Sequence, residues 1–193
     1  MPVVQDAFTT LSGNLQQLVG TFAVTGGQVT CNDNANGYGI CQYTTVTDTA
    51  NQFAEISVAT LDTTTSRAIG VSLRMGTAGQ NYQVAVNGAA GGSWELSKFV
   101  GFTKTTISGA TAITLTLPVR VRLEAIGSTI RVVIGGVTVG TYTDTSVATG
   151  NKIGLYTEAC NSTCFADDLY AGDLYPPPMG QPSQAASVRA STY

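Results

Sequence analysis

The chain of 193 residues contains no histidine. Histidine is the side chain that most often changes charge near neutral pH, and it is the commonest zinc ligand, so its absence removes the usual general base. A Ser-His-Asp or Cys-His catalytic arrangement is therefore excluded.

Charged residues are scarce as well: they make up 11% of the chain, against about 25% in an average soluble protein. The nine Lys and Arg residues are scattered singly between Arg67 and Arg189. Nucleic acids and anionic membranes both require a clustered basic surface, so neither is expected as a partner. The chain has no apolar run of the roughly 18 residues that a membrane-spanning helix needs.

The first residues, MPVVQDAFTT, lack the basic start and the apolar core of a secretion signal. We therefore expect a protein that is made and folded in a cytosol, with nothing removed before Met1.

Instead of charge, the chain is rich in Thr, Ser, Asn, Gln and Gly, including 22 glycines. Threonine is β-branched and suits a pleated surface, and glycine suits tight turns. Apolar and polar residues alternate with a period of two, as in residues 119–124, where three apolar side chains alternate with three charged ones. This pattern predicts strands with one buried and one exposed face.

The stretch STIRVVIGGVTVGTYTD, residues 128–144, predicts a hairpin that turns at Gly135 and Gly136. Two glycines permit the positive φ angles of a type I′ turn. This turn would place Val137 opposite Ile134 and Val139 opposite Val132.

Nine further stretches have strand character, and residues 12–18 could form at most a short helical turn. The predicted strands are 21–24, 28–31, 40–46, 53–59, 68–75, 82–87, 94–100, 152–157 and 165–174. About a dozen short strands separated by turns predict an all-β fold, a two-sheet antiparallel sandwich over residues 1–175.

The last residues, 176–193, differ from the rest because they hold four of the six prolines and no strand pattern. We predict an extended C-terminal arm, which either lies along its own domain or docks on a neighbouring subunit. The arm residues singled out for assembly contacts are Pro176, Pro177, Pro178, Met179, Arg189 and Tyr193.

Five segments occur in a familiar order: DAFTT, GGSWELSKFVG, VRLEAIGSTIRVVIGGVTVGTYTD, NKIGLYTE and FADDLYAGDL. Over about residues 6 to 174 this order resembles the concanavalin A-like, or laminin G-like, jelly-roll domains that are found in bacterial extracellular proteins and in structural proteins of tailed bacteriophages. The resemblance implies a jelly-roll sandwich. It does not fix the function, because one fold serves many functions.

Glycoside hydrolases of the wider jelly-roll superfamily carry acidic residues two or more apart on one strand. The chain has no such E-x-D-x-x-E run: Glu95 follows Trp94 alone, and Glu124 lies beside two arginines. We therefore predict that the protein is not an enzyme and has no catalytic residues.

Some laminin G-like domains bind calcium, and here Asp167 and Asp168, with Asp173 nearby, are weak calcium candidates. The alternative is that these aspartates cap the strand or form hydrogen bonds near Asp6. No other cofactor is expected.

The four cysteines suggest disulfides, most simply Cys31 with Cys41 and Cys160 with Cys164, although cross pairing between the two pairs stays open. A zinc site made of all four thiolates is the rival, but the usual C-x2-C spacing is missing. Disulfides would suit a protein that ends up outside a reducing cytosol.

Trp94 is the single tryptophan. An exposed ring on a sandwich face could contact a glycan, whereas a ring packed between the sheets would belong to the core.

These observations lead to one main hypothesis and one alternative. The main hypothesis is a virion structural protein of a tailed bacteriophage, a capsid decoration or cement subunit or a tail or neck accessory, on the particle exterior. Its partners would be other virion proteins, such as the major capsid protein, and further copies of itself. The alternative is a carbohydrate-binding adhesion module.

Overall fold

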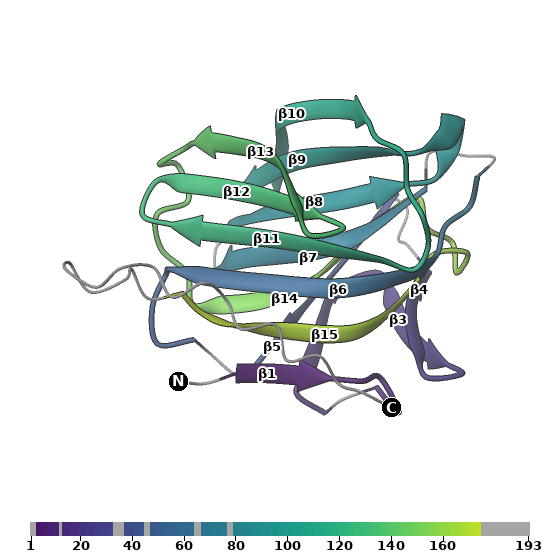
Figure 1. Ribbon diagram of the computed structural model, residues 1–193. Coiled ribbons are helices and arrows are strands. Elements are labelled where there is room, and N and C mark those ends of the chain that lie inside the picture. The colour runs from purple at the N-terminus through teal and green to yellow at the C-terminus, as the bar shows by residue number, and fades with distance from the viewer. Residues whose placement is uncertain are drawn as a thin grey trace, which may run out of the picture.

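Two stacked antiparallel sheets form the domain (Figure 1), in a computed structural model that describes residues 3–11, 13–32, 37–44, 47–63, 67–76 and 79–174. In the front sheet of Figure 1 the strands follow the order β13 (Val137–Thr143), β12 (Thr129–Ile134), β11 (Val119–Ile126), β6 (Gln52–Thr60), β15 (Phe165–Asp173), β4 (Gln28–Asn32) and β3 (Thr21–Thr25), and β1 (Val3–Asp6) also pairs with β15. In the back sheet the order is β10 (Thr103–Ala112), β9 (Ser93–Val100), β8 (Asn81–Asn87), β7 (Ala68–Met75), β14 (Lys152–Glu158), β5 (Tyr38–Tyr43) and β2 (Leu15–Val19). The predicted all-β, two-sheet antiparallel sandwich is confirmed.

Three strands, β1, β2 and β10, do not appear among the strand stretches predicted above. Residues 12–18 were expected to form at most a helical turn, but β2 begins at Leu15 and pairs with β5 as an edge strand. Strand β10 is mostly exposed, and its pairing with β9 shifts twice, between Thr106 and Ser108 and between Ser108 and Thr111. Such bulges break the alternation by which a strand is recognised in a sequence.

The hairpin at residues 129–143 has the predicted turn and a different register beyond it. Gly135 and Gly136 both have positive φ angles, 58° and 80°, and Val137 lies opposite Ile134 as expected. A bulge then places Gly140, rather than Val139, opposite Val132. A side chain at position 140 would have no room, because a Cβ there would lie 2.9 Å from the ring of Trp94.

The core lies between the sheets and is built by the alternation seen in the sequence. Val119, Val121 and Leu123 of β11 all point inward and are buried. The back sheet contributes Ile69, Val71, Leu73, Tyr82, Val84, Val86, Trp94, Leu96, Ile153 and Leu155 to the same core. No helix in the described part of the chain is long and apolar enough to cross a membrane. The predicted arm, 176–193, lies outside the described residues.

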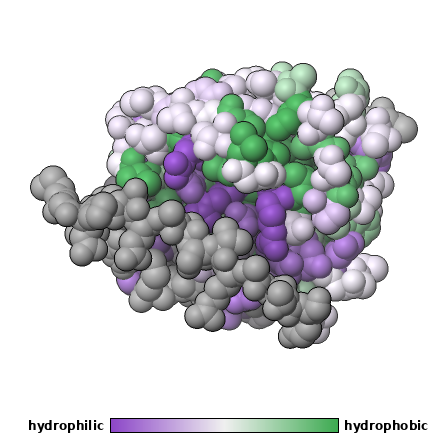
Figure 2. All heavy atoms as spheres, in the orientation of Figure 1, coloured by the Kyte–Doolittle hydropathy of each residue, from purple (hydrophilic) through white to green (hydrophobic). Residues whose placement is uncertain are grey.

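The outer face of the front sheet carries paired charges, which form the hydrophilic band over β6 and β11 in Figure 2. Glu124 is buried and bonded to Arg131 and to Arg122, whose Nε lies 2.6 Å from the carboxylate. The Arg122 guanidinium also lies 4.1 Å from the centre of the Phe53 ring. The Glu124 carboxylate is thus part of a structural ion-pair network.

Asp144, directly after β13, ties the front sheet to the back sheet. Its carboxylate accepts hydrogen bonds from the Tyr82 hydroxyl at 2.6 Å, from Lys98 Nζ at 2.5 Å and from the Ser146 amide at 2.9 Å. Partial burial acts to raise the pKa of Asp144, but these donors, Lys98 foremost, outweigh it and hold the pKa well below its usual value. Burial and the Asp144 carboxylate together raise the pKa of Tyr82 to about 12.

Replacing Asp144 with asparagine is expected to lower the free energy of unfolding at pH 7 by about 1 to 2 kcal/mol. Because the pKa of this carboxyl is lowered in the folded state, its contribution is present above the unfolded pKa of about 4 and is lost as the pH falls below it. Urea unfolding of both proteins at pH 7, 4 and 2 measures this. A difference that stays constant over this range would contradict the assignment.

Candidate functional site

The back sheet curls strongly, so that its outer face becomes a groove. Strands β9 and β5 are four positions apart in the sheet, which would separate them by about 19 Å if the sheet were flat. Nevertheless, the Phe99 ring on β9 lies only 5.3 Å from the Tyr38 ring on β5. Lys104 on β10 likewise reaches Glu158 on β14, at 2.6 Å. The two sides of the sheet therefore meet across the groove.

Small residues permit this curvature. Side chains on the concave face of a curved sheet converge, and here Gly70 and Gly154 occupy that face on the central strands β7 and β14. A Cβ at Gly70 would lie 1.8 Å from the carbonyl oxygen of Val84, and one at Gly154 would lie 1.9 Å from that of Cys41. These glycines are thus required by the close approach of neighbouring backbones.

A row of uncharged polar side chains crosses the floor of the groove. The Asn81 amide donates to Ser72 Oγ at 3.1 Å and to the Gln83 side-chain carbonyl at 2.9 Å. The Gln83 amide in turn donates to Ser97 Oγ at 2.9 Å. All four side chains are buried, and their mutual hydrogen bonds offset the cost of removing them from water.

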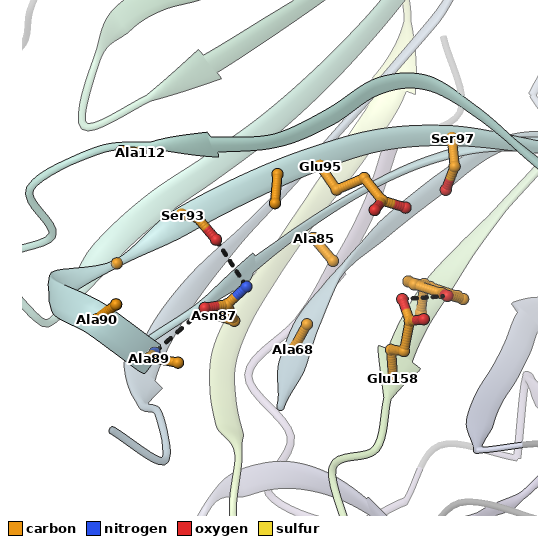
Figure 3. Close-up of a pocket in the computed structure, with 13 residues that line it drawn as sticks. Ala68, Ala85, Asn87, Ala89, Ala90, Ser93, Glu95, Ser97, Ala112 and Glu158 are labelled. Atoms are coloured by element: carbon orange, nitrogen blue, oxygen red, sulfur yellow. Dashed lines mark hydrogen bonds between the residues drawn. The ribbon is translucent and has the colours of Figure 1, made fainter. Parts of the chain in front are cut away.

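A pocket of about 360 Å³ opens at one end of the groove (Figure 3). Its lining combines small side chains with a few polar groups: Ala68, Ala85, Asn87, Ala89, Ala90, Gly92, Ser93, Glu95, Ser97, Ala110, Ala112, Tyr156 and Glu158. Figure 3 shows Glu95 and Ser97 on β9 and Glu158 on β14 at different sides of this space. Within the wall, the Asn87 amide donates to Ser93 Oγ at 2.7 Å.

Lys104 connects the two carboxylates of the pocket. Its Nζ donates to Glu158 Oε2 at 2.6 Å and lies 3.0 Å from Glu95 Oε1. Both contacts are ion pairs, but only the contact with Glu158 is also a hydrogen bond, since the buried Glu95 oxygen receives no aligned hydrogen bond from the described residues. The same ammonium lies 5.8 Å from the centre of the Tyr156 ring. Burial acts to lower the pKa of Lys104, but Glu158 and Glu95 outweigh it and raise the pKa.

Trp94 lies in the core and not in the groove. Its ring is 2% exposed and packs edge-on against Tyr142, with the ring centres 6.4 Å apart. Alternation along β9 explains this, because Trp94 and Leu96 point inward while Ser93, Glu95 and Ser97 face the groove. The proposed glycan contact at Trp94 is corrected accordingly: the ring has no exposed face on which a sugar could stack.

The aspartates considered for calcium have protein partners instead. Both Asp173 carboxylate oxygens accept hydrogen bonds, from the amides of Asp48 at 3.0 Å and Thr49 at 2.8 Å. Asp168 contacts Arg120 at 3.4 Å, and Asp167 accepts the amide of Asp168 at 2.8 Å. Among the described residues, no three acidic or thiol side chains are grouped as a metal site would require. Calcium binding at Asp167 and Asp168 stays a prediction.

All four cysteines are buried in the core, and none of them forms a disulfide. The predicted disulfides at Cys31, Cys41, Cys160 and Cys164 are therefore absent from this structure. A backbone hydrogen bond closes the turn between Cys160 and Cys164 instead: the Thr163 amide donates to the Cys160 carbonyl at 3.0 Å. The Cys164 thiol stabilises the Cys160 thiolate and lowers the pKa of Cys160. For the rival zinc site, the described residues show no group of three or more cysteine or acidic side chains placed to hold a metal ion.

Comparisons with known proteins identify the fold. No protein-family model matches the chain, and no curated protein matches its sequence. Among solved structures, the carbohydrate-binding module CBM66 from Bacillus subtilis is similar with a TM-score of 0.65 at 16% identity, over 80% of this chain and 91% of that one. The Crh5 transglycosylase in complex with NAG is similar with a TM-score of 0.63 at 12% identity, over 90% of this chain and 85% of that one. A Bacillus licheniformis β-glucanase has a TM-score of 0.61 at 9% identity, over 90% of this chain and 99% of that one. The chain thus has the jelly-roll sandwich fold that the sequence resemblance implied.

Proposed function

We propose that the protein is a carbohydrate-binding module and that the pocket at the end of the back-sheet groove holds the glycan. The observation that carries the proposal is this pocket of about 360 Å³, which is lined by small side chains and by a few hydrogen-bonding groups. Small-molecule sites in proteins have volumes of roughly 300 to 1,000 Å³. The similarity to a carbohydrate-binding module and to two carbohydrate-active enzymes supports the same class of ligand.

The pocket's chemistry suits sugar hydroxyls. Glu95 and Glu158 offer carboxylate oxygens to hydroxyl donors, and Asn87 and Ser93 offer an amide and a hydroxyl. The alanines of the wall allow a bulky ring to approach these groups closely. Sugar recognition needs several such partners, since each hydrogen bond replaces one that the sugar makes with water.

The proposal is for binding without turnover. Glycoside hydrolysis needs one carboxyl group that donates a proton and a second that acts as base or nucleophile. Here both carboxylates contact the Lys104 ammonium, at 2.6 and 3.0 Å, and we assign them to holding a cationic group rather than to proton transfer.

Filling the pocket from its exposed wall tests the proposal. Ala112→Trp is expected to abolish glycan binding, because Ala112 lines the pocket on the exposed edge strand β10, where a large ring can enter without disturbing the core. Thr111→Trp is the matched control, since Thr111 lies next to it on the same strand but does not line the pocket. A glycan array probed with all three proteins measures this. Absence of glycan binding by the unaltered protein, or equal glycan binding by both variants, would contradict the proposal.

The role in a virion stays a prediction. It depends on the arm at 176–193, which lies outside the described residues, and on partners such as a major capsid protein. The solved structures similar to this chain favour the carbohydrate-binding alternative.

A further inference from the structure

The groups around the Lys104 ammonium form a cage suited to any ammonium ion. Two carboxylates, Glu158 at 2.6 Å and Glu95 at 3.0 Å, supply opposite charge, and the Tyr156 ring supplies a π face 5.8 Å from the nitrogen. The Tyr156 hydroxyl donates to the same Glu158 oxygen at 2.9 Å, which fixes that carboxylate in place. Carboxylates and aromatic faces are the groups that proteins use to bind ammonium ligands.

From this cage we propose that the pocket recognises glycans that carry protonated amino groups, and that Lys104 occupies the ammonium position in the free protein. The inference rests on the proposed function, and it names the class of sugar. A glucosamine unit presents a hydroxyl-rich ring and an ammonium group on one scaffold. Its ring would lie in the pocket, and its ammonium would replace that of Lys104.

The three residues of the cage line the pocket, whereas Lys104 does not. Glu95, Tyr156 and Glu158 all line the pocket, and Lys104 is not among the lining residues. Lys104 belongs to edge strand β10, whose side chains are mostly exposed and whose pairing with β9 contains two register shifts. Because an edge strand with few buried contacts opens at low cost, Lys104 can withdraw and leave the cage to a ligand.

Charge at the site favours cationic over anionic sugars. Two carboxylates and one ammonium leave a net negative charge, and no lysine or arginine lines the pocket. Three arginines lie on β11 and β12 of the opposite sheet, where acidic side chains already pair with them. A uronic acid polymer would therefore find like charge at this pocket and no guanidinium partner.

Lys104→Met provides the test, because it removes the competing ammonium and keeps an unbranched side chain with an apolar stem. Calorimetric titration at pH 6 compares a glucosamine tetramer, an N-acetylglucosamine tetramer and a galacturonate tetramer. The variant is expected to bind the glucosamine tetramer at least about tenfold more tightly than the unaltered protein does, since the ligand no longer displaces Lys104. Affinity for the acetylated tetramer is expected to change less than about twofold, and the galacturonate tetramer is expected not to bind.

A second variant and a second comparison keep the test decisive if Lys104→Met is unstable. Glu158→Gln is expected to weaken binding of the glucosamine tetramer more than binding of the acetylated one. In the unaltered protein alone, binding of the glucosamine tetramer is expected to weaken with added salt. Binding of the acetylated or galacturonate tetramer with no preference for the amine would overturn this inference and leave the proposed function standing. Failure of all three oligosaccharides and of the array would overturn both.

Discussion

Arg74→Met is expected to lower the free energy of unfolding by about 3 to 5 kcal/mol. The side chain is 1% exposed, and its guanidinium donates to three backbone carbonyls: Ala50 at 2.7 Å, Val147 at 3.1 Å and Gly127 at 2.6 Å. Methionine fills much of the volume but donates no hydrogen bond, so these carbonyls would be left without a donor. Burial lowers the pKa of Arg74 below its usual value. Urea unfolding at pH 7 measures the loss.

The large effect follows from where the three carbonyls lie. Ala50 precedes β6, Gly127 forms the β11 to β12 turn, and Val147 precedes β14, so one side chain joins loops from both sheets. Gln52 extends the network: it accepts the Arg74 amide at 2.8 Å. Arg120→Met is the control, since its side chain is 46% exposed and its ion pairs, at 3.4 and 3.7 Å, are expected to contribute less than about 1 kcal/mol. Equal losses in the two variants would contradict the role of Arg74.

Local alternation was enough to predict most of the sheets, because a strand with one buried face repeats every two residues. In residues 119–124 the three apolar side chains are indeed buried, and the rule did not predict that Glu124, on the other face, is buried as well. The same rule did not reveal β10, where two register shifts interrupt the alternation, or Gly140 as the partner of Val132. Bulges depend on what packs beneath a strand, and at Gly140 this is the ring of Trp94.

The pocket could not be predicted, because its charged groups come from three strands. Glu95, Lys104 and Glu158 meet only through the curvature of the back sheet, and in the sequence Glu95 has no acidic neighbour. One signal was available: Gly70 and Gly154 each lie inside a strand, where glycine often marks the close approach of another backbone, and both positions are crowded. Because successive side chains of a strand point to opposite faces, the sequence of β9 also places Trp94 and Glu95 on opposite faces of the sheet.

Gly70→Val is expected to lower the free energy of unfolding by about 3 kcal/mol or more, because position 70 has no space for a side chain. A Cβ there would lie 1.8 Å from the Val84 carbonyl oxygen and 2.7 Å from the Ala85 Cα, both in the neighbouring strand. Backbone atoms cannot rotate away as a flexible side chain can. Strands β7 and β8 would have to separate, which would flatten the groove. Chemical denaturation and a glycan titration of the folded fraction measure both consequences.

Gly109→Val is the matched control for Gly70→Val, since both introduce a β-branched residue into a strand of the same sheet. Gly109 lies on exposed edge strand β10, and a Cβ there would meet no atom within 4 Å. Valine suits a strand better than glycine does, so the control is expected to leave stability unchanged or slightly increased. If Gly70→Val were as stable as this control, the back sheet could not be as tightly curved as the Phe99 and Tyr38 contact implies, and the groove would lose its physical basis.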